Sequence, residues 1–168
     1  IQTIKNAGSQ KFIIHARNGI LKGLSPRQNR NIPPRKYDYV YKLKKDFPHL
    51  EIVINGGIKN LDESETHLKS VDGVMIGRSI YKYPLRWSEI DQKIYGLNKK
   101  SLCASKIIFS LIPYIDNHLK NGGKIWDICK HLINLVESIP NAKAWRNEIS
   151  TKSIKKEFRD EQYSLKNL

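Results

Sequence analysis

The stretch VDGVMIGRSIYKYP, residues 71–84, decides the fold, because a short apolar run in it ends abruptly in Gly-Arg. Two similar runs precede it, KFIIHA at residues 11–16 and EIVING at residues 51–56. None of these runs alternates apolar with polar residues, a pattern typical of strands buried on both faces of a parallel sheet. We therefore predict three parallel strands, the last of them at residues 73–77.

Helical segments separate the predicted strands. Residues 37–47 carry apolar side chains near helical spacing, and residues 61–70 offer Asp62 as a helix cap. The order strand, helix, strand, helix, strand makes two successive βα units. Three parallel strands alone leave apolar edges unpaired, so we expect further strands upstream of Ile1.

From about residue 101 the apolar residues take helical spacing only. One predicted helix carries Pro113 as a kink or boundary, and it is followed by a turn at residues 120–124. Its apolar face is formed by Ile108, Leu111, Ile112, Ile115 and Leu119. In a second predicted helix the side chains that face inward are Ile125, Cys129, Leu132 and Val136. We predict an α/β part at residues 1–95, a helical domain at 96–150 and a frayed, charged tail at 151–168.

The composition is that of a folded protein with a marked excess of positive charge. The 168 residues are 39% hydrophobic and 27% charged, and 30 Lys and Arg against 16 Asp and Glu give a net charge of +14. Such a charge indicates a polyanionic partner, most simply nucleic acid, although lysine accumulation in an AT-rich genome is the alternative. No stretch is apolar enough for a membrane span or a signal peptide, so we expect a soluble, cytoplasmic protein without a membrane partner.

The two cysteines, Cys103 and Cys129, do not have the spacing of metal ligands, and two cysteines are too few for a disulfide framework. We expect both to be small packing residues and no metal to be bound.

Polar or glycine residues follow each predicted strand at its carboxyl end, which is where parallel α/β folds bind ligands. They are His15-Ala16-Arg17, Asn55-Gly56-Gly57 and Gly77-Arg78. Bare glycine backbone together with a forked guanidinium suits a phosphate group. The alternatives are that Gly56-Gly57 is only a turn and that His15 is a core histidine. No nucleophile, metal cluster or carboxylate pair accompanies these residues, so they indicate cofactor binding without a reaction centre.

A long segment, GLSPRQNRNIPP at residues 23–34, follows the first strand and is called the basic loop here. It is longer than a βα connection requires, and it carries Arg27 and Arg30. It is either a solvated loop or a surface that grips a phosphate backbone, with both arginines pointing one way.

At these residues the sequence resembles a known family. HARNGILKGLSPRQNRNIPPRKYDYVYKLKKDFPHLEIVINGGI (residues 15–58) and HLKSVDGVMIGRSIYKYP (67–84) are similar to the second half of tRNA-dihydrouridine synthases of the A subfamily. Residues 112–150 resemble the C-terminal helical domain of that family more weakly. The resemblance implies an α/β fold, namely the last three βα units of a (β/α)8 TIM barrel, followed by a small α-helical tRNA-binding domain.

The resemblance also implies an activity and its residues. Members of the family use NADPH to reduce FMN, which then reduces the C5=C6 bond of D-loop uridines in tRNA. It implies that His15 contacts the flavin and that the FMN phosphate is held by Asn55, Gly56, Gly57, Gly77 and Arg78. It places tRNA contacts at Arg27, Arg30, Lys143 and Arg146, with lysine replacing a more usual arginine at position 143.

The catalytic cysteine and the flavin-contacting lysine of the family lie upstream of the equivalent of Ile1. Neither Cys103 nor Cys129 aligns with that cysteine, so we expect no catalytic residue in this chain and no activity from it alone.

Three hypotheses follow. The chain is a fragment of such a synthase, or a truncated, non-catalytic remnant that retains only RNA binding. The third is a different FMN barrel acting on a small metabolite, which accounts for the phosphate site but not for the basic loop. None of them implies a protein partner.

Overall fold

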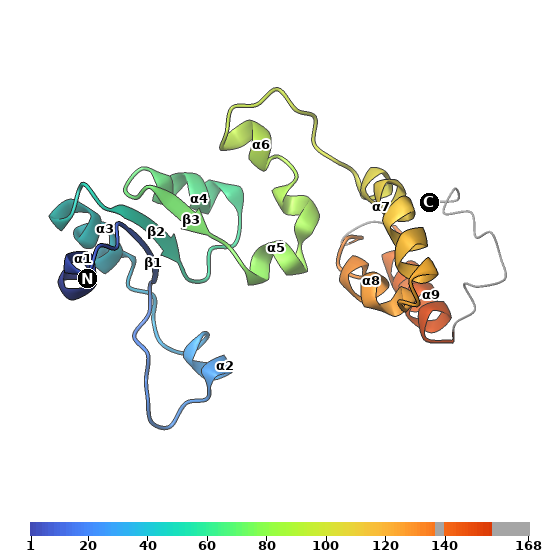
Figure 1. The fold of residues 1–168 in the computed structure, drawn as a ribbon, viewed down its shortest axis with the longest axis horizontal. Coiled ribbons are helices and arrows are strands. Elements are labelled where there is room, and N and C mark those ends of the chain that lie inside the picture. The colour runs from blue at the N-terminus through green and yellow to red at the C-terminus, as the bar shows by residue number, and fades with distance from the viewer. Residues whose placement is uncertain (137–139, 156–168) are drawn as a thin grey trace. The chain divides into compact units, whose positions relative to one another are not determined.

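The computed structural model describes residues 1–136 and 140–155, with side chains described as far as residue 151. This part of the chain forms two compact units, the first from Ile1 to Ser79 and the second beginning at Ile80. Figure 1 shows the order of the helices and strands along the chain. All strands found in the described residues belong to the first unit.

The first unit is built on a parallel sheet of three strands, β1 (Lys11–His15), β2 (Glu51–Asn55) and β3 (Gly73–Met75), in the order β1-β2-β3. Both pairings are parallel, which confirms the predicted α/β class with three parallel strands. Each strand ends one or two residues before its predicted limit.

The two faces of this sheet differ: the prediction that the strands are buried on both faces is confirmed for the central strand β2 and wrong for β1 and β3. Phe12, Ile52 and Ile54 share one face and are 8% exposed or less. On the opposite face Ile13 is 56% and Met75 46% exposed. Val53 of β2 lies on this second face and is 9% exposed; in a closed barrel the face would line the interior.

The helices that contact the strands are α3 (Tyr37–Asp46), next to β2, and α4 (Leu61–Leu68), next to β3. Each contributes a buried apolar residue, Val40 and Leu61 respectively. Phe12, Ile52 and Ile54, the least exposed strand residues, lie on the face that we assign to these helices. A short helix, α1 (Gln2–Asn6), precedes the sheet.

The cap of α4 was predicted wrongly. Asn60 caps the helix, since its side chain accepts a hydrogen bond from the backbone N–H of Glu63 at 2.8 Å. A capping residue needs an extended backbone, which Asn60 has, whereas Asp62 is already helical. Asp62 lies instead in the first turn, where a carboxylate interacts favourably with the helix dipole.

The basic loop contains a short helix, α2 (Pro26–Asn29). Ser25 and Gln28 form a capping box, in which each side chain accepts a hydrogen bond from the other residue's backbone N–H. The Asn29 amide also bonds to both backbone groups of Ile20. The loop is therefore folded by its own polar side chains.

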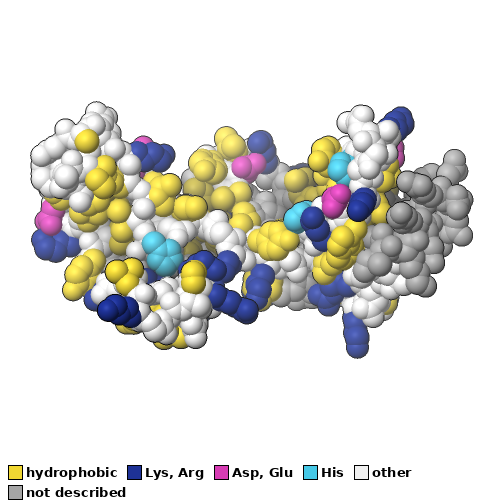
Figure 2. All heavy atoms as spheres, turned by 60° about the horizontal axis from the view of Figure 1, so that its bottom comes forward, with side chains coloured by type: hydrophobic (Ala, Val, Ile, Leu, Met, Phe, Trp, Pro, Cys, Tyr) yellow, Lys and Arg dark blue, Asp and Glu magenta, His cyan; other side chains and the backbone are white. Residues whose placement is uncertain are grey.

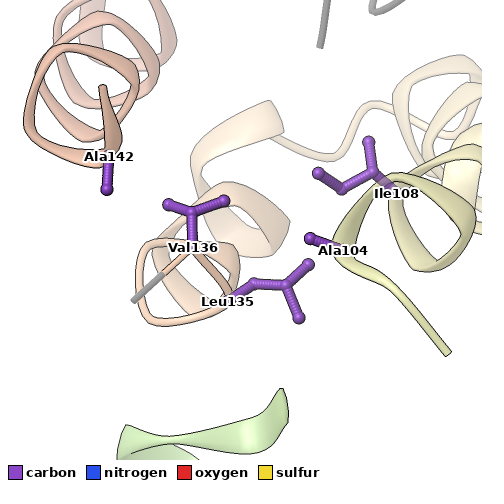
Figure 3. Close-up of a cluster of buried hydrophobic side chains, with 5 residues drawn as sticks. All are labelled: Ala104, Ile108, Leu135, Val136 and Ala142. Atoms are coloured by element: carbon purple, nitrogen blue, oxygen red, sulfur yellow. The ribbon is translucent and has the colours of Figure 1, made fainter. Parts of the chain in front are cut away.

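The second unit is helical in its described part. Its elements are α5 (Arg78–Lys82), which spans the division between the units, the 3₁₀ helix η1 (Pro84–Trp87), α6 (Ile90–Lys93), α7 (Ala104–Lys120), α8 (Ile125–Leu132) and α9 (Ala142–Lys155). Figure 3 shows the core between α7, the turn after α8 and the start of α9. It consists of Ala104, Ile108, Leu135, Val136 and Ala142.

Three details of the predicted helical part differ. Pro113 lies inside α7, which continues past it; the position is exposed, so the carbonyl that loses its amide partner faces water. Of the predicted α7 face, Ile108 is buried but Leu119 is 39% exposed. The tail predicted to fray from Lys152 is helical as far as Lys155, and residues 156–168 lie outside the described residues.

The division between the units does not coincide with the predicted domain limit. Residues 80–95, which the sequence assigns to the barrel part, fall in the second compact unit. Compactness follows contacts within this chain only, so the domain limit at residue 95 stays a prediction.

A carboxylate joins two strands at the end of the sheet opposite the glycine turns. Asp72 Oδ2 accepts the backbone N–H of Ile52 at 2.8 Å and lies 2.7 Å from the Lys44 ammonium. Partial burial alone raises the pKa of Asp72, but the Ile52 hydrogen bond and the Lys44 charge outweigh it and lower that pKa below its ordinary value.

We predict that Asp72→Ala lowers the free energy of unfolding by about 1.5–3 kcal/mol, because a charge-assisted hydrogen bond is lost and the Ile52 N–H is left without its acceptor. Urea denaturation at pH 7 measures this. Glu65→Ala, at an exposed position of α4, is the control and changes the stability little. Equal stability of the two variants would contradict the role given to Asp72.

Candidate functional site

The structure brings the carboxyl ends of the three strands together in register. His15 pairs with Asn55, and Asn55 pairs with Met75, so the residues that follow the strands emerge at one edge of the sheet. We call the six predicted cofactor residues at this edge the strand-end site: His15, Asn55, Gly56, Gly57, Gly77 and Arg78. Asn55 ties the edge together, since its amide donates to the Met75 carbonyl at 2.8 Å.

The glycines of the strand-end site are explained in two different ways. Gly56 and Gly57 have positive φ angles of 127° and 75°, a region that favours glycine. A Cβ on Gly57 would also lie 2.7 Å from the Nε of Arg35. A Cβ on Gly77, by contrast, meets nothing within 4 Å among the described residues. The first two glycines are thus required by the turn itself, while Gly77 leaves its backbone accessible.

A tyrosine that the sequence did not single out for the site holds the glycine turn. The Tyr37 hydroxyl donates to the Gly56 carbonyl at 2.7 Å and lies 3.5 Å from Nη1 of Arg35. With its carbonyl held by Tyr37, the Gly56 peptide has a fixed orientation. In the sequence Tyr37 contributes only to the helical spacing of residues 37–47. A hydrogen bond between residues 19 positions apart produces no periodic pattern that could be recognised in the sequence.

Arg78 bonds to the basic loop. Its Nη1 donates to the side-chain oxygen of Asn31, and its Nη2 donates to the backbone carbonyl of Arg30 at 3.1 Å. The predicted phosphate ligand and the predicted RNA-binding loop are therefore in direct contact.

Arg17, two residues after the end of β1, also donates hydrogen bonds to the basic loop. Its Nη1 donates to the carbonyls of Asn31, at 2.9 Å, and Pro33. The backbone of Arg17 pairs with that of Arg35 in an isolated antiparallel bridge, which closes the base of the loop. The Arg17 Nε is buried and has no hydrogen-bond partner in the described structure. The sequence placed Arg17 at the strand end but gave it no role.

The electrostatics of this edge are those of crowded cations. Partial burial, followed by the charges of Arg17, Arg78 and Arg30, lowers the pKa of His15. Burial, and then the Arg35 and Arg78 charges, lower the pKa of Arg17. Among the described residues no ion pair joins these four arginines to a carboxylate. An anion bound here would relieve their mutual repulsion.

The predicted RNA contacts lie in both units. Arg27 and Arg30 are exposed and three residues apart on the helical backbone of α2 and its cap, so they share one side of it. Lys143 and Arg146 are likewise three residues apart on α9. Figure 2 shows that Lys and Arg side chains are more prominent than Asp and Glu on the face drawn.

The cysteine prediction was half right. Cys129 is 5% exposed and packs inside the second unit, but Cys103 is exposed at the start of α7. The described residues contain no group of three His, Cys, Asp or Glu side chains that suits a metal ion. They also include no helix long and apolar enough to cross a bilayer.

Comparison with known proteins gives the chain a family. A family model described as "Dihydrouridine synthase (Dus)" matches residues 1–167. The chain belongs to the dihydrouridine synthase family. Two similar proteins are both named tRNA-dihydrouridine(20/20a) synthase. The one from Shewanella oneidensis is 44% identical over 155 residues, and the one from Vibrio cholerae is 42% identical over 151 residues.

A third protein of the same name, from Synechocystis sp., is 41% identical over 154 residues. These alignments cover 90–92% of this chain but 46% of each relative. The chain thus spans about half the length of the curated relatives it matches.

We predict that Tyr37→Phe lowers the free energy of unfolding of this dihydrouridine synthase chain by about 1 kcal/mol, because the Gly56 carbonyl loses its hydrogen bond. Thermal or urea denaturation measures the loss. Tyr39→Phe is the matched control, since Tyr39 is 70% exposed on the same helix. If both variants unfold at the same denaturant concentration, Tyr37 does not hold the turn.

Proposed function

We propose that this chain supplies the flavin-phosphate site and the RNA-contacting surfaces of a tRNA-dihydrouridine synthase of the A subfamily. In this proposal it corresponds to the last three βα units of the barrel and the helical domain that follows. One observation carries it: in a chain of this family, Gly77, Arg78 and the Asn55-Gly56-Gly57 turn meet at one sheet edge, among arginines that no ion pair within the described residues neutralises.

The residues at the strand-end site fit the phosphate of FMN. The fixed Gly56-Gly57 turn and the accessible Gly77 supply backbone near one another, and Arg78 supplies charge. A phosphate dianion would offset the repulsion between Arg78, Arg17 and Arg30. His15, level with Asn55, is then placed to contact the flavin beyond its phosphate.

When bound and reduced by NADPH, FMN supplies hydride for the C5=C6 bond of uridine. In this proposal the residues of the chain bind the cofactor phosphate and hold the RNA, and burial together with the nearby arginines lowers the pKa of His15, which favours its neutral form. Both cysteines lie in the second unit, away from the strand ends in sequence. We infer that the proton for the uracil ring comes from a group outside these 168 residues, and that the chain alone does not reduce uridine.

The names of the relatives specify positions 20 and 20a of tRNA, and we propose these uridines as the targets. Arg27 and Arg30 of the basic loop, with Lys143 and Arg146 of α9, would contact the tRNA backbone. Such contacts give affinity that falls with salt and carries no base specificity. A uridine must leave its stack to reach a flavin in a barrel.

The second candidate function is RNA binding without catalysis. The observation that favours it is the net charge of +14 in a chain that spans about half the length of its relatives. The two candidates differ in whether FMN is bound.

The test uses the protein as its gene encodes it, purified and supplied with FMN, NADPH and tRNA lacking dihydrouridine. Bound flavin and NADPH-dependent dihydrouridine at positions 20 and 20a would support the synthase. Salt-dependent tRNA binding with no flavin absorbance and no dihydrouridine would favour the RNA-binding protein instead and contradict the first proposal.

We predict that Arg78→Ala weakens FMN binding by about 1.5–3 kcal/mol, roughly 10- to 150-fold, because charge-assisted hydrogen bonds to the phosphate are lost. Fluorescence quenching of FMN measures the dissociation constant. Lys69→Ala removes one exposed cation beside α4 and serves as the control. Unchanged FMN affinity in Arg78→Ala would refute the phosphate assignment.

Arg27→Ala is expected to act on RNA alone. It should weaken tRNA binding and reduce the slope of log affinity against log salt by about 1, while FMN affinity stays the same. Filter binding over a salt series measures this, with Lys45→Ala on α3 as the control. A variant that loses its flavin would show that the roles of the two regions are assigned wrongly.

A further inference from the structure

Arg78 stands between two regions to which the proposed function gives separate tasks. It follows the third strand, at the proposed phosphate site, yet its guanidinium donates to Asn31 and to the Arg30 carbonyl in the basic loop. Arg30 is itself one of the proposed RNA contacts. One side chain therefore touches the cofactor site and the backbone of an RNA-binding residue.

Asn31 supplies one of the two acceptors on the loop that bind Arg78, beside the Arg30 carbonyl. Its side-chain oxygen accepts from Arg78, and its backbone carbonyl accepts from Arg17 at 2.9 Å. The two bonds use different groups of the same residue. Replacing the side chain would remove the bond to Arg78 and leave the bond to Arg17 intact.

The guanidinium of Arg78 has enough donors to serve both regions together. It carries five N–H donors in a planar fork, and two of them are used on the loop. Three remain for a phosphate, so a bound anion need not displace Asn31. A phosphate would instead fix the position of the guanidinium while its bonds to the loop stay in place.

The basic loop has its own internal support, which determines what Arg78 can change. The Ser25–Gln28 capping box and the Asn29 amide, which bonds to Ile20 and Leu24, hold its shape. The bonds from Arg78 are made to the end of the loop, at Arg30 and Asn31. They set the position of that end relative to the strand ends, not the shape of the loop.

We propose that Asn31 is a positioning residue that couples cofactor binding to RNA binding through Arg78. This rests on the proposed function. A phosphate at the strand-end site fixes Arg78, Arg78 fixes Arg30 through the loop backbone, and tRNA then binds a surface whose ordering cost is already met. Because coupling between two binding events is reciprocal, tRNA tightens FMN binding by the same factor.

The experiment measures tRNA affinity with and without saturating FMN, in the protein as its gene encodes it. We expect FMN to tighten tRNA binding about fivefold or more, the lower end of ordinary allosteric coupling. In Asn31→Ala that ratio should fall, even where tRNA still binds, because one of the two bonds from Arg78 to the loop is lost while the bond to the Arg30 carbonyl remains. The quantity compared is the ratio of tRNA affinities with and without FMN, measured within each variant. A general loss of stability lowers both affinities and therefore does not by itself change this ratio.

Two variants serve as controls. Asn18→Ala, at an exposed position early in the same connection, should keep the ratio of the unmodified protein. Asn31→Asp keeps an acceptor oxygen for Arg78 and should keep a ratio above that of the alanine variant, which guards against misfolding of Asn31→Ala.

The outcomes separate the coupling from the proposed function. If the unmodified protein binds both FMN and tRNA but its ratio is one or below, or if Asn31→Ala keeps the full ratio, the coupling is refuted and the function stands. If the unmodified protein binds no FMN or no tRNA, the proposed function itself has failed.

Discussion

The contacts that two arginines make with one segment of backbone organise the functional edge of this molecule. Arg17, after β1, and Arg78, after β3, both donate to the end of the basic loop, to groups of Arg30, Asn31 and Pro33. These bonds draw the loop toward the strand ends and gather cations there. Since no ion pair within the described residues neutralises them, the arrangement favours the binding of an anion. That property, more than the sheet itself, supports the proposed phosphate and RNA sites.

Much of the fold followed from the sequence because it depends on local pattern. The continuous apolar runs located the three strands, and register brought His15 and Asn55 to one edge as parallel pairing requires. The contacts that shape the carboxyl edge of the sheet could not be predicted from the sequence, because they are polar contacts between residues far apart in the chain. The bond from Tyr37 to Gly56 and the approach of Arg35 to Gly57 are examples. The sequence assigned Gly57 to phosphate binding, but its positive φ and the nearness of the Arg35 side chain already favour glycine there without any ligand.

The family places these observations within a longer architecture. The chain matches the dihydrouridine synthase model over residues 1–167, and it spans about half the length of the curated relatives it matches. The exposed face of the sheet, with Ile13 and Met75, is consistent with strands that line a barrel interior. The proposed RNA contacts fall in two compact units, so their joint contribution depends on both units meeting one tRNA.

We propose that the glycine turn after β2 and the Gly77-Arg78 pair after β3 hold the phosphate of FMN. A crystal structure of the protein as its gene encodes it, grown with FMN, would show whether they do. We expect phosphate oxygens about 2.8–3.0 Å from Arg78 and from backbone N–H groups of Gly57 or Gly77. A flavin whose phosphate lies away from both strand ends, with Arg78 still bonded only to the loop, would contradict it.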